Sequence, residues 1–224
     1  MGTNTLTNNA TVTSSADARR GSGSADLEAT SSQYFSRTDA DLSSGFPGKS
    51  GETNKDFTVG AWVKAESLGD AQTIMSKYNG AATNRTWHMS IRDDGGIKKA
   101  MLGLGYNSGG TEELKIHASA LSAGSWYFIA ATYADATKAY SLRVRNSQCV
   151  EVGSDLDSTA TLDANGLSIT DADFKIGAIG ATVQFFDGLI DYAFVYNEAL
   201  SESEIEALCG TTRRSRGAAM MMGW

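Results

Sequence analysis

One stretch near the C-terminus decides the fold class: FKIGAIGATVQFFDGLIDYAFVYNEALSESEIEALC, from Phe174 to Cys209. Apolar side chains alternate along residues 188–196, which is the pattern of a strand that buries one face of a sheet. Ser201 and Glu204 then form an S-x-x-E capping box, in which each side chain satisfies the other residue's free backbone N–H. The stretch therefore predicts a strand that leads directly into a short capped helix.

Short runs of alternating apolar and polar residues recur from Asp26 onward, separated by turn signals such as Asn79-Gly80. Such even spacing with one convincing helix is typical of two antiparallel sheets that face each other. We therefore predict an all-β, two-sheet antiparallel sandwich with one short C-terminal helix. The expected strands span residues 33–38, 56–65, 72–78, 85–93, 99–107, 114–118, 125–134, 139–145, 174–179 and 188–196.

The period of two along a strand assigns side chains to faces. In residues 86–92 we expect Trp87, Met89 and Ile91 to face the core, and His88, Ser90 and Arg92 to face outward. The outward set is where a binding function could lie.

Two further segments carry a resemblance to a known family. They are FTVGAWVKAESL (residues 57–68) and GSWYFIAATYAD (residues 124–135). Together with the ending, they resemble the laminin-G-like, concanavalin A-type jelly-roll modules, in the family's order from about Asp26 to Leu208. The resemblance implies a jelly roll, but this scaffold carries lectins, glycosidases, adhesion modules and virion proteins alike.

Composition divides the chain into three parts. Residues 1–25 hold scarcely an apolar side chain, so we expect a flexible N-terminal arm that is not part of the core. Residues 26–209 have the length of a single sandwich domain. Residues 210–224 form a basic, Met-rich tail. Arginine, methionine and tryptophan are typical of contact surfaces, so we expect this tail to dock onto a partner. The residues expected to dock this tail onto a larger assembly are Arg213, Arg214, Arg216, Met220, Met221, Met222 and Trp224.

The net charge of −7 argues against a nucleic-acid partner, because phosphate binding needs clustered Lys and Arg. No apolar run approaches the roughly 20 residues of a membrane helix, and the N-terminus lacks the apolar centre of a signal peptide. We expect Cys149 and Cys209, the chain's two cysteines, to be reduced and packed, although a single bridge between them remains open.

The resemblance also implies a place for ligands, because the concave sheet of such jelly rolls can form a sugar-binding groove. We interpret Trp62 and Trp126 as packing residues. For His88 the alternatives are a solvated strand residue or part of a polar strip with Ser90 and Arg92. The candidate glycan-binding residues are Tyr78, Trp87, His88, Arg92, Tyr106 and Arg143.

No catalytic motif is present. Glycosidases that share this architecture carry an E-x-D-x-x-E strand, because a retaining mechanism needs two carboxylates about 5 Å apart. The sequence has no such strand, and its pair Glu112-Glu113 is interpreted as solvated surface in a turn-like segment. We therefore predict that the protein is not an enzyme.

Calcium is the cofactor that the resemblance suggests, since many relatives hold a structural ion between the first strand and the last. Asp191 in GLIDY matches the family's aspartate, and Asp26 is a plausible second ligand. Calcium needs six to eight oxygens, so carbonyls and water would complete the shell. The alternative is that Asp191 accepts hydrogen bonds that tie the last strand to a neighbouring loop.

The leading functional hypothesis is a non-enzymatic virion decoration or adhesin protein, made in the host cytoplasm without a signal peptide. Its ends would dock onto capsid or tail proteins, and its jelly roll would bind cell-surface glycans weakly. Bacteriophage virions use laminin-G-like modules in this manner, and the protein could also form a homo-oligomer. The alternatives are a soluble bacterial carbohydrate-binding lectin outside the cell and a degenerate glycoside hydrolase.

Overall fold

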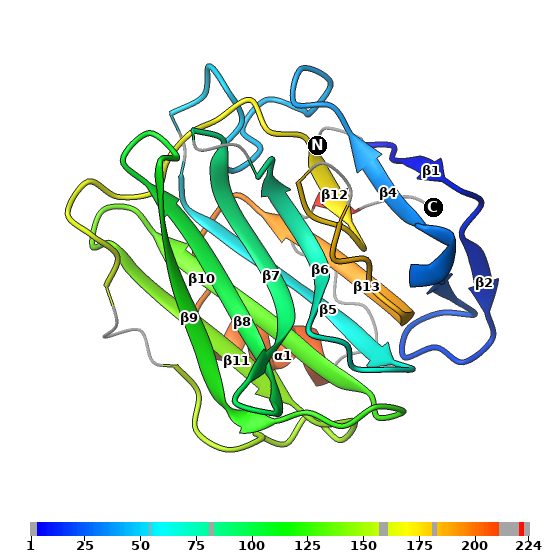
Figure 1. Cartoon of the computed structure of the whole chain (residues 1–224). Helices are drawn as coiled ribbons and strands as arrows, with labels where there is room; N and C mark the ends of the chain where they lie inside the picture. The colour runs from blue at the N-terminus through cyan, green and yellow to red at the C-terminus, as the bar shows by residue number, and fades with distance from the viewer. Residues whose placement is uncertain are drawn as a thin grey trace.

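The computed structural model describes residues 4–53, 55–80, 83–156, 161–180 and 183–210, together with the backbone of residues 220–221. Two antiparallel sheets lie face to face, and the helix α1 (Glu202–Gly210) lies against the outside of one of them (Figure 1). The predicted two-sheet jelly roll with one short C-terminal helix is confirmed.

The order of strands places sequence-distant segments side by side. The first sheet runs β1 (Thr7–Asn9), β4 (Tyr34–Arg37), β12 (Phe174–Ile176), β6 (Ala71–Tyr78), β7 (Arg85–Asp94), β8 (Ile97–Tyr106), β9 (Thr111–Ala120). The second sheet runs β11 (Ala139–Arg145), β10 (Tyr127–Ala134), β5 (Phe57–Ala65), β13 (Gly188–Tyr196), β3 (Ser24–Leu27), β2 (Thr13–Ser15). A two-residue strand, β14 (Met220–Met221), pairs with β13, and a 3₁₀ turn, η1 (Ala29–Ser31), follows β3.

The core lies between the sheets and is centred on Trp87 of β7. Its ring centroid lies 5.5 Å from that of Phe57 in β5 and 5.9 Å from that of Phe174 in β12. Trp87, Met89 and Ile91 all belong to this core, so their predicted inward face is confirmed.

The N-terminal segment is part of the fold, and the prediction of a flexible arm is wrong for its described residues. Strand β1 pairs with β4 at the edge of the first sheet, and β2 pairs with β3 at the edge of the second. Val12, between them, is buried, and the Asn8 side chain bonds both its N–H and its carbonyl. Edge strands of this kind are held by backbone hydrogen bonds, which an apolar count along the sequence does not detect.

Helix α1 begins as the capping box predicts. The backbone N–H of Ser201 donates to Glu204 Oε2 at 2.9 Å, and the N–H of Glu204 donates to Ser201 Oγ at 3.4 Å. Ile205 packs onto aromatic residues on the outer face of the second sheet, including Trp62 and Phe194. The helix therefore gives this sheet a second, smaller core.

Of the C-terminal tail, the structure describes only the backbone of residues 220–221. Met220 pairs with Val195 and Met221 with Phe194, so this part of the tail returns to the chain's own second sheet. The other residues predicted to dock the tail lie outside the described residues: Arg213, Arg214, Arg216, Met222 and Trp224.

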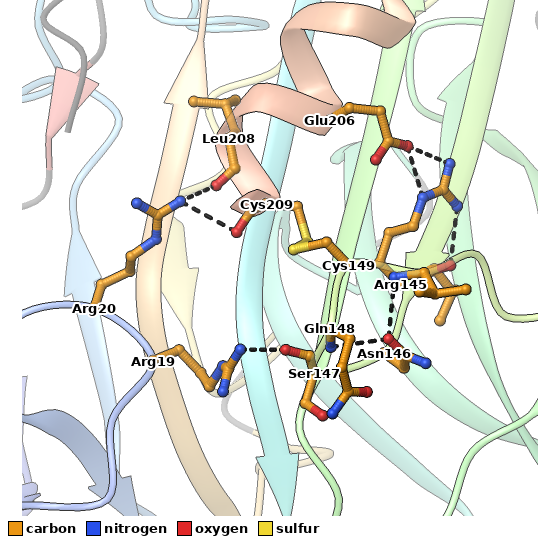
Figure 2. Close-up of a disulfide and its surroundings, with 12 residues drawn as sticks. Arg19, Arg20, Arg145, Asn146, Ser147, Gln148, Cys149, Glu206, Leu208 and Cys209 are labelled. Atoms are coloured by element: carbon orange, nitrogen blue, oxygen red, sulfur yellow. Dashed lines mark hydrogen bonds and ion pairs between the residues drawn. A yellow bond between two sulfur atoms is a disulfide. The ribbon is translucent and has the colours of Figure 1, made fainter. Parts of the chain in front are cut away.

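Cys149 and Cys209 form a disulfide, so the prediction of two reduced thiols is wrong (Figure 2). Their Cα atoms lie 5.8 Å apart although 60 residues separate them in sequence. Cys209 lies in the last turn of helix α1 and Cys149 follows β11, and only the packing of the helix on the sheet brings them together. The guanidinium of Arg20 also binds the carbonyl oxygens of Leu208 and Cys209, and Arg19 binds that of Ser147.

An ion-pair network holds the start of the same helix. Arg145 binds Asp155 through two nitrogens, at 2.8 and 2.7 Å. Arg143 lies 2.9 Å from Asp155 and 3.0 Å from Glu202 of the helix, and Arg145 donates to Glu206 at 2.7 Å. Asp155 therefore orients two arginines of β11 that in turn bind α1.

The Asp155 network makes stability depend on acid pH. Burial alone would raise the pKa of Asp155, but contacts with His117 and Arg145 outweigh it and hold that pKa well below its usual range. A carboxyl with a lowered folded-state pKa stabilises the fold above its unfolded pKa of about 4, and this stabilisation is lost as the pH falls further.

We expect Asp155 to contribute about 1–3 kcal/mol to the loss of unfolding free energy between about pH 5 and about pH 2. Urea unfolding across this range should show that the free energy of unfolding falls less steeply with decreasing pH in Asp155→Asn than in the unsubstituted chain. Asp94→Asn is the control, because Asp94 is exposed and pairs with Lys99 at the surface. Equal slopes for all three proteins would contradict the prediction.

Candidate functional site

The outward face of the first sheet carries a groove of about 860 Å³. Strands β6, β7, β8 and β9, which lie side by side at the front of Figure 1, form its floor. One wall is formed by Ile179, Gly180, Val183 and Gln184. The lining residues that matter for its chemistry are Tyr78, His88, Arg92, Met101, Glu112 and Leu114.

A hydrogen-bonded pair occupies the groove floor. His88 Nε2 lies 2.7 Å from Glu112 Oε1, and Ser90 Oγ lies 3.3 Å from His88 Nδ1. Gly103 of β8 lies opposite His88, and a Cβ there would come within 2.1 Å of His88 Nε2 and 2.6 Å of Glu112 Oε1. Because glycine has no side chain, the space above Gly103 is available for the contact between His88 and Glu112.

Tyr78 places an aromatic ring beside this pair. Its ring meets that of His88 edge-on, with centroids 5.3 Å apart, and its hydroxyl lies 3.5 Å from Glu112 Oε2. Burial and the Glu112 charge raise the pKa of Tyr78 above its ordinary value. The hydroxyl therefore stays protonated at neutral pH and can donate a hydrogen bond.

Apolar side chains complete the groove on both sides. Leu114 of β9 is 38% exposed and Val183 of the opposite wall is 54% exposed, although large apolar side chains are usually buried. Apolar walls around a few convergent polar groups are the usual construction of a small-molecule site. A sugar, which has apolar C–H faces and hydroxyl edges, matches such a surface.

Three of the six candidate glycan residues meet in this groove: Tyr78, His88 and Arg92. Of the alternatives for His88, the polar strip with Ser90 agrees with the contacts. Trp87 is fully buried, so its prediction as a glycan residue is wrong. It neighbours His88 in sequence, and adjacent residues of a strand face opposite sides of the sheet.

The other two candidates lie away from the groove. Tyr106 is partly buried and packs against the main core. Arg143 belongs to the second sheet, where it binds Asp155 and Glu202. Neither residue lines this groove, and a glycan-binding role for either stays a prediction.

The strand predicted at residues 114–118 begins too late to include Glu112. Glu112 was expected in a solvated turn, but β9 begins at Thr111, and Glu112 pairs with Gly105 of β8. The signal was the Gly-rich turn before it, since a turn at residues 107–110 returns the chain beside β8 and extends the sheet.

The predicted calcium ligands have different surroundings. Asp191 Oδ2 accepts the backbone N–H groups of Arg19 and Arg20 at 2.6 and 2.5 Å, as in the hydrogen-bond alternative. Asp26 Oδ1 is buried and has no hydrogen-bond partner among the described residues. No group of three His, Cys, Asp or Glu side chains that could hold a metal occurs in the described ranges. These side chains alone do not fit the six to eight oxygens of calcium, and its binding stays a prediction.

Within the part of the chain that the structure describes, no helix has the length and apolar character needed to cross a membrane.

Solved structures show where else this fold occurs. The enzymatically active domain of tailspike protein 2 from bacteriophage CBA120 superposes with a TM-score of 0.71 at 14% identity, covering 99% of this chain and 33% of that chain. The CBM40 of Ruminococcus gnavus IT-sialidase, bound to α2,3-sialyllactose, gives 0.54 at 21% identity, with 70% and 83% covered. Domain 4 of the Geobacillus stearothermophilus arabinanase AbnA, bound to arabinotriose, gives 0.59 at 20% identity, with 89% and 81% covered.

These similarities show the fold, which carbohydrate-binding modules and an enzyme domain share. The chain spans about a third of the tailspike chain. None of the curated proteins compared with this sequence matches it. The model of the family Laminin_G_3, described as the concanavalin A-like lectin/glucanases superfamily, matches residues 29–206. The chain therefore belongs to the concanavalin A-like lectin/glucanases superfamily.

Proposed function

We propose that this protein is a non-enzymatic adhesion module that binds a glycan in the groove across β6–β9. The observation that carries the proposal is the convergence of Tyr78, His88 and Glu112 between the exposed apolar side chains of Leu114 and Val183. Two structural neighbours hold bound oligosaccharides, which supports a sugar ligand for this fold.

We further propose that the module is displayed on a virion, as a decoration or adhesin protein. The superposition on a phage tailspike domain over 99% of this chain supports this placement. The alternative is a soluble bacterial lectin. Purified particles of the source virus that carry many copies would favour the first, and free protein in the culture medium would favour the second.

The proposal that the protein is not an enzyme is supported by the contacts of the groove carboxylates among the described residues. Glu112 binds His88 and Tyr78, and Asp93 accepts hydrogen bonds from Lys98 and the N–H of Gly96. Asp70, the third carboxylate of the lining, is exposed and lies 4.0 Å from Lys98. We expect no shortening of any oligosaccharide that the protein binds, measured by mass spectrometry after prolonged incubation. Turnover would contradict this part of the proposal.

The glycan site itself is tested by removing the aromatic ring. We expect Tyr78→Ala to weaken binding about tenfold or more, because the ring supplies contact area and the hydroxyl supplies a donor. Glycan-array screening would identify a ligand, and calorimetry would measure the change. Tyr34→Ala is the matched control, since Tyr34 is a half-buried tyrosine of β4 in the same sheet, outside the groove. Unchanged binding by Tyr78→Ala would contradict the site.

A further inference from the structure

Arg92 is the arginine that lines the groove, and its guanidinium meets no oxygen acceptor among the described residues. It is exposed on β7, in the same outward row as His88 and Ser90. Its Nη1 lies 4.0 Å from the sulfur of Met101, and among the described residues the guanidinium has no oxygen acceptor.

Other described arginines are engaged. Arg19, Arg20 and Arg37 donate to backbone carbonyls, and Arg143 and Arg145 bind carboxylates. Arg85 lies over the ring of Tyr78, with its guanidinium carbon 5.8 Å from the ring centroid. The planar donor group of Arg92 is therefore free to meet a ligand in the groove.

Each carboxylate near Arg92 has a cation or a hydrogen-bond partner beside it. Asp93 binds Lys98 at 2.6 Å, Asp94 binds Lys99 at 2.8 Å, and Asp70 lies 4.0 Å from Lys98. The cations Arg92, Lys98 and Lys99 match these aspartates in number, and Glu112, the other carboxylate that lines the groove, is hydrogen-bonded to His88. The protein's overall negative charge acts from a distance and is screened by salt.

We infer that the glycan bound in the groove carries a carboxylate, which Arg92 binds through two of its nitrogens. Guanidinium and carboxylate match in a planar, bidentate geometry that hydroxyl groups do not reproduce, and a lysine does not replace it. The sugar ring would then lie along Met101 and Leu114 toward Tyr78. This inference rests on the proposed glycan-binding function, and its carboxylate could come from a uronic acid or from a sialic acid.

The experiment compares each acidic sugar with its neutral counterpart. Calorimetry would use oligogalacturonate against its methyl ester, and sialyllactose against lactose. We expect one acidic member to bind at least about tenfold more tightly than its counterpart, which is the scale of a hydrogen bond to a charged group. Arg92→Gln should remove the preference for the acidic sugar, and Arg92→Lys should keep only part of it. Which pair responds identifies the source of the carboxylate.

Arg37→Gln is the control, because it removes the same charge from β4, outside the groove. An equal loss in Arg37→Gln and Arg92→Gln would mean general charge attraction and would overturn the inference. Preference for a neutral sugar, lost in Tyr78→Ala but kept in Arg92→Gln, would also overturn it and leave the groove intact. If no sugar of either pair or of a broad array bound, both the inference and the proposed function would fail.

Discussion

Asp39→Ala should lower the free energy of unfolding by about 3–5 kcal/mol, because it leaves a buried ammonium group without its carboxylate. Lys77 of β6 is fully buried, and the Asp39 side chain is only 6% exposed. Lys77 Nζ donates to Asp39 Oδ1 at 2.7 Å and to the carbonyls of Thr170 and Ala172 at 2.9 and 2.7 Å. The pair therefore joins the loop after β4 and the segment before β12 to the end of β6.

The direction of the Lys77 pKa agrees with this reasoning. Burial lowers the pKa of Lys77, and the hydrogen bond and charge of Asp39 oppose that change only in part. Without Asp39, nothing from that carboxylate would offset the desolvation of the Lys77 ammonium, and the free energy of unfolding would fall accordingly.

A double variant separates the charge from the packing. Asp39→Ala combined with Lys77→Met should be more stable than Asp39→Ala alone, since no charge remains buried. Chemical denaturation of both variants measures the difference. Asp94→Ala, which removes a surface carboxylate paired with Lys99, should cost no more than about 1 kcal/mol. A double variant less stable than the single one would show that the ammonium is not the source of the cost.

Loss of the disulfide should be the second large effect. Cys149→Ser with Cys209→Ser should cost about 4 kcal/mol, because a bridge across 60 residues strongly restricts the unfolded chain. Reduction of the unsubstituted protein should lower its denaturation midpoint, with a similar loss of unfolding free energy. Glycan binding should be unaffected, because the bridge lies on the second sheet and the groove on the first.

The double serine variant also supplies the control for reduction. A reductant should not shift its midpoint, since it has no bridge to break. Equal midpoints for the oxidised and reduced forms of the unsubstituted chain would contradict the prediction. A loss of glycan binding on reduction would instead show that the disulfide on the second sheet affects the groove on the first.

Part of the candidate site could be predicted from local pattern. The alternation in residues 86–92 assigned His88 and Arg92 to the outward face, and both line the groove. The same alternation assigned Trp87 to the core, so its inclusion among the glycan residues conflicted with the stronger signal. The turn at residues 107–110 could have placed Glu112 on a strand, but its meeting with His88 depends on the pairing of β9 with β8 and on the space beside Gly103.

The ends of the chain show the limit of composition as a guide. Residues 7–15 hold few apolar side chains, but they extend both sheets because an edge strand accepts backbone hydrogen bonds from almost any sequence. Composition measures what side chains can bury, and it does not report which backbone groups find partners.

Sequence alone determined the strand faces, the capped helix after β13 and the superfamily, because each depends on spacings within a few residues or on short motifs in a known order. The tertiary structure decided what depends on contacts between distant segments. These are the Cys149–Cys209 bridge, the buried Lys77–Asp39 pair and the meeting of Tyr78, His88 and Glu112. Local periodicity fixes which side of a strand a residue faces, but strand order and register fix which residue it meets.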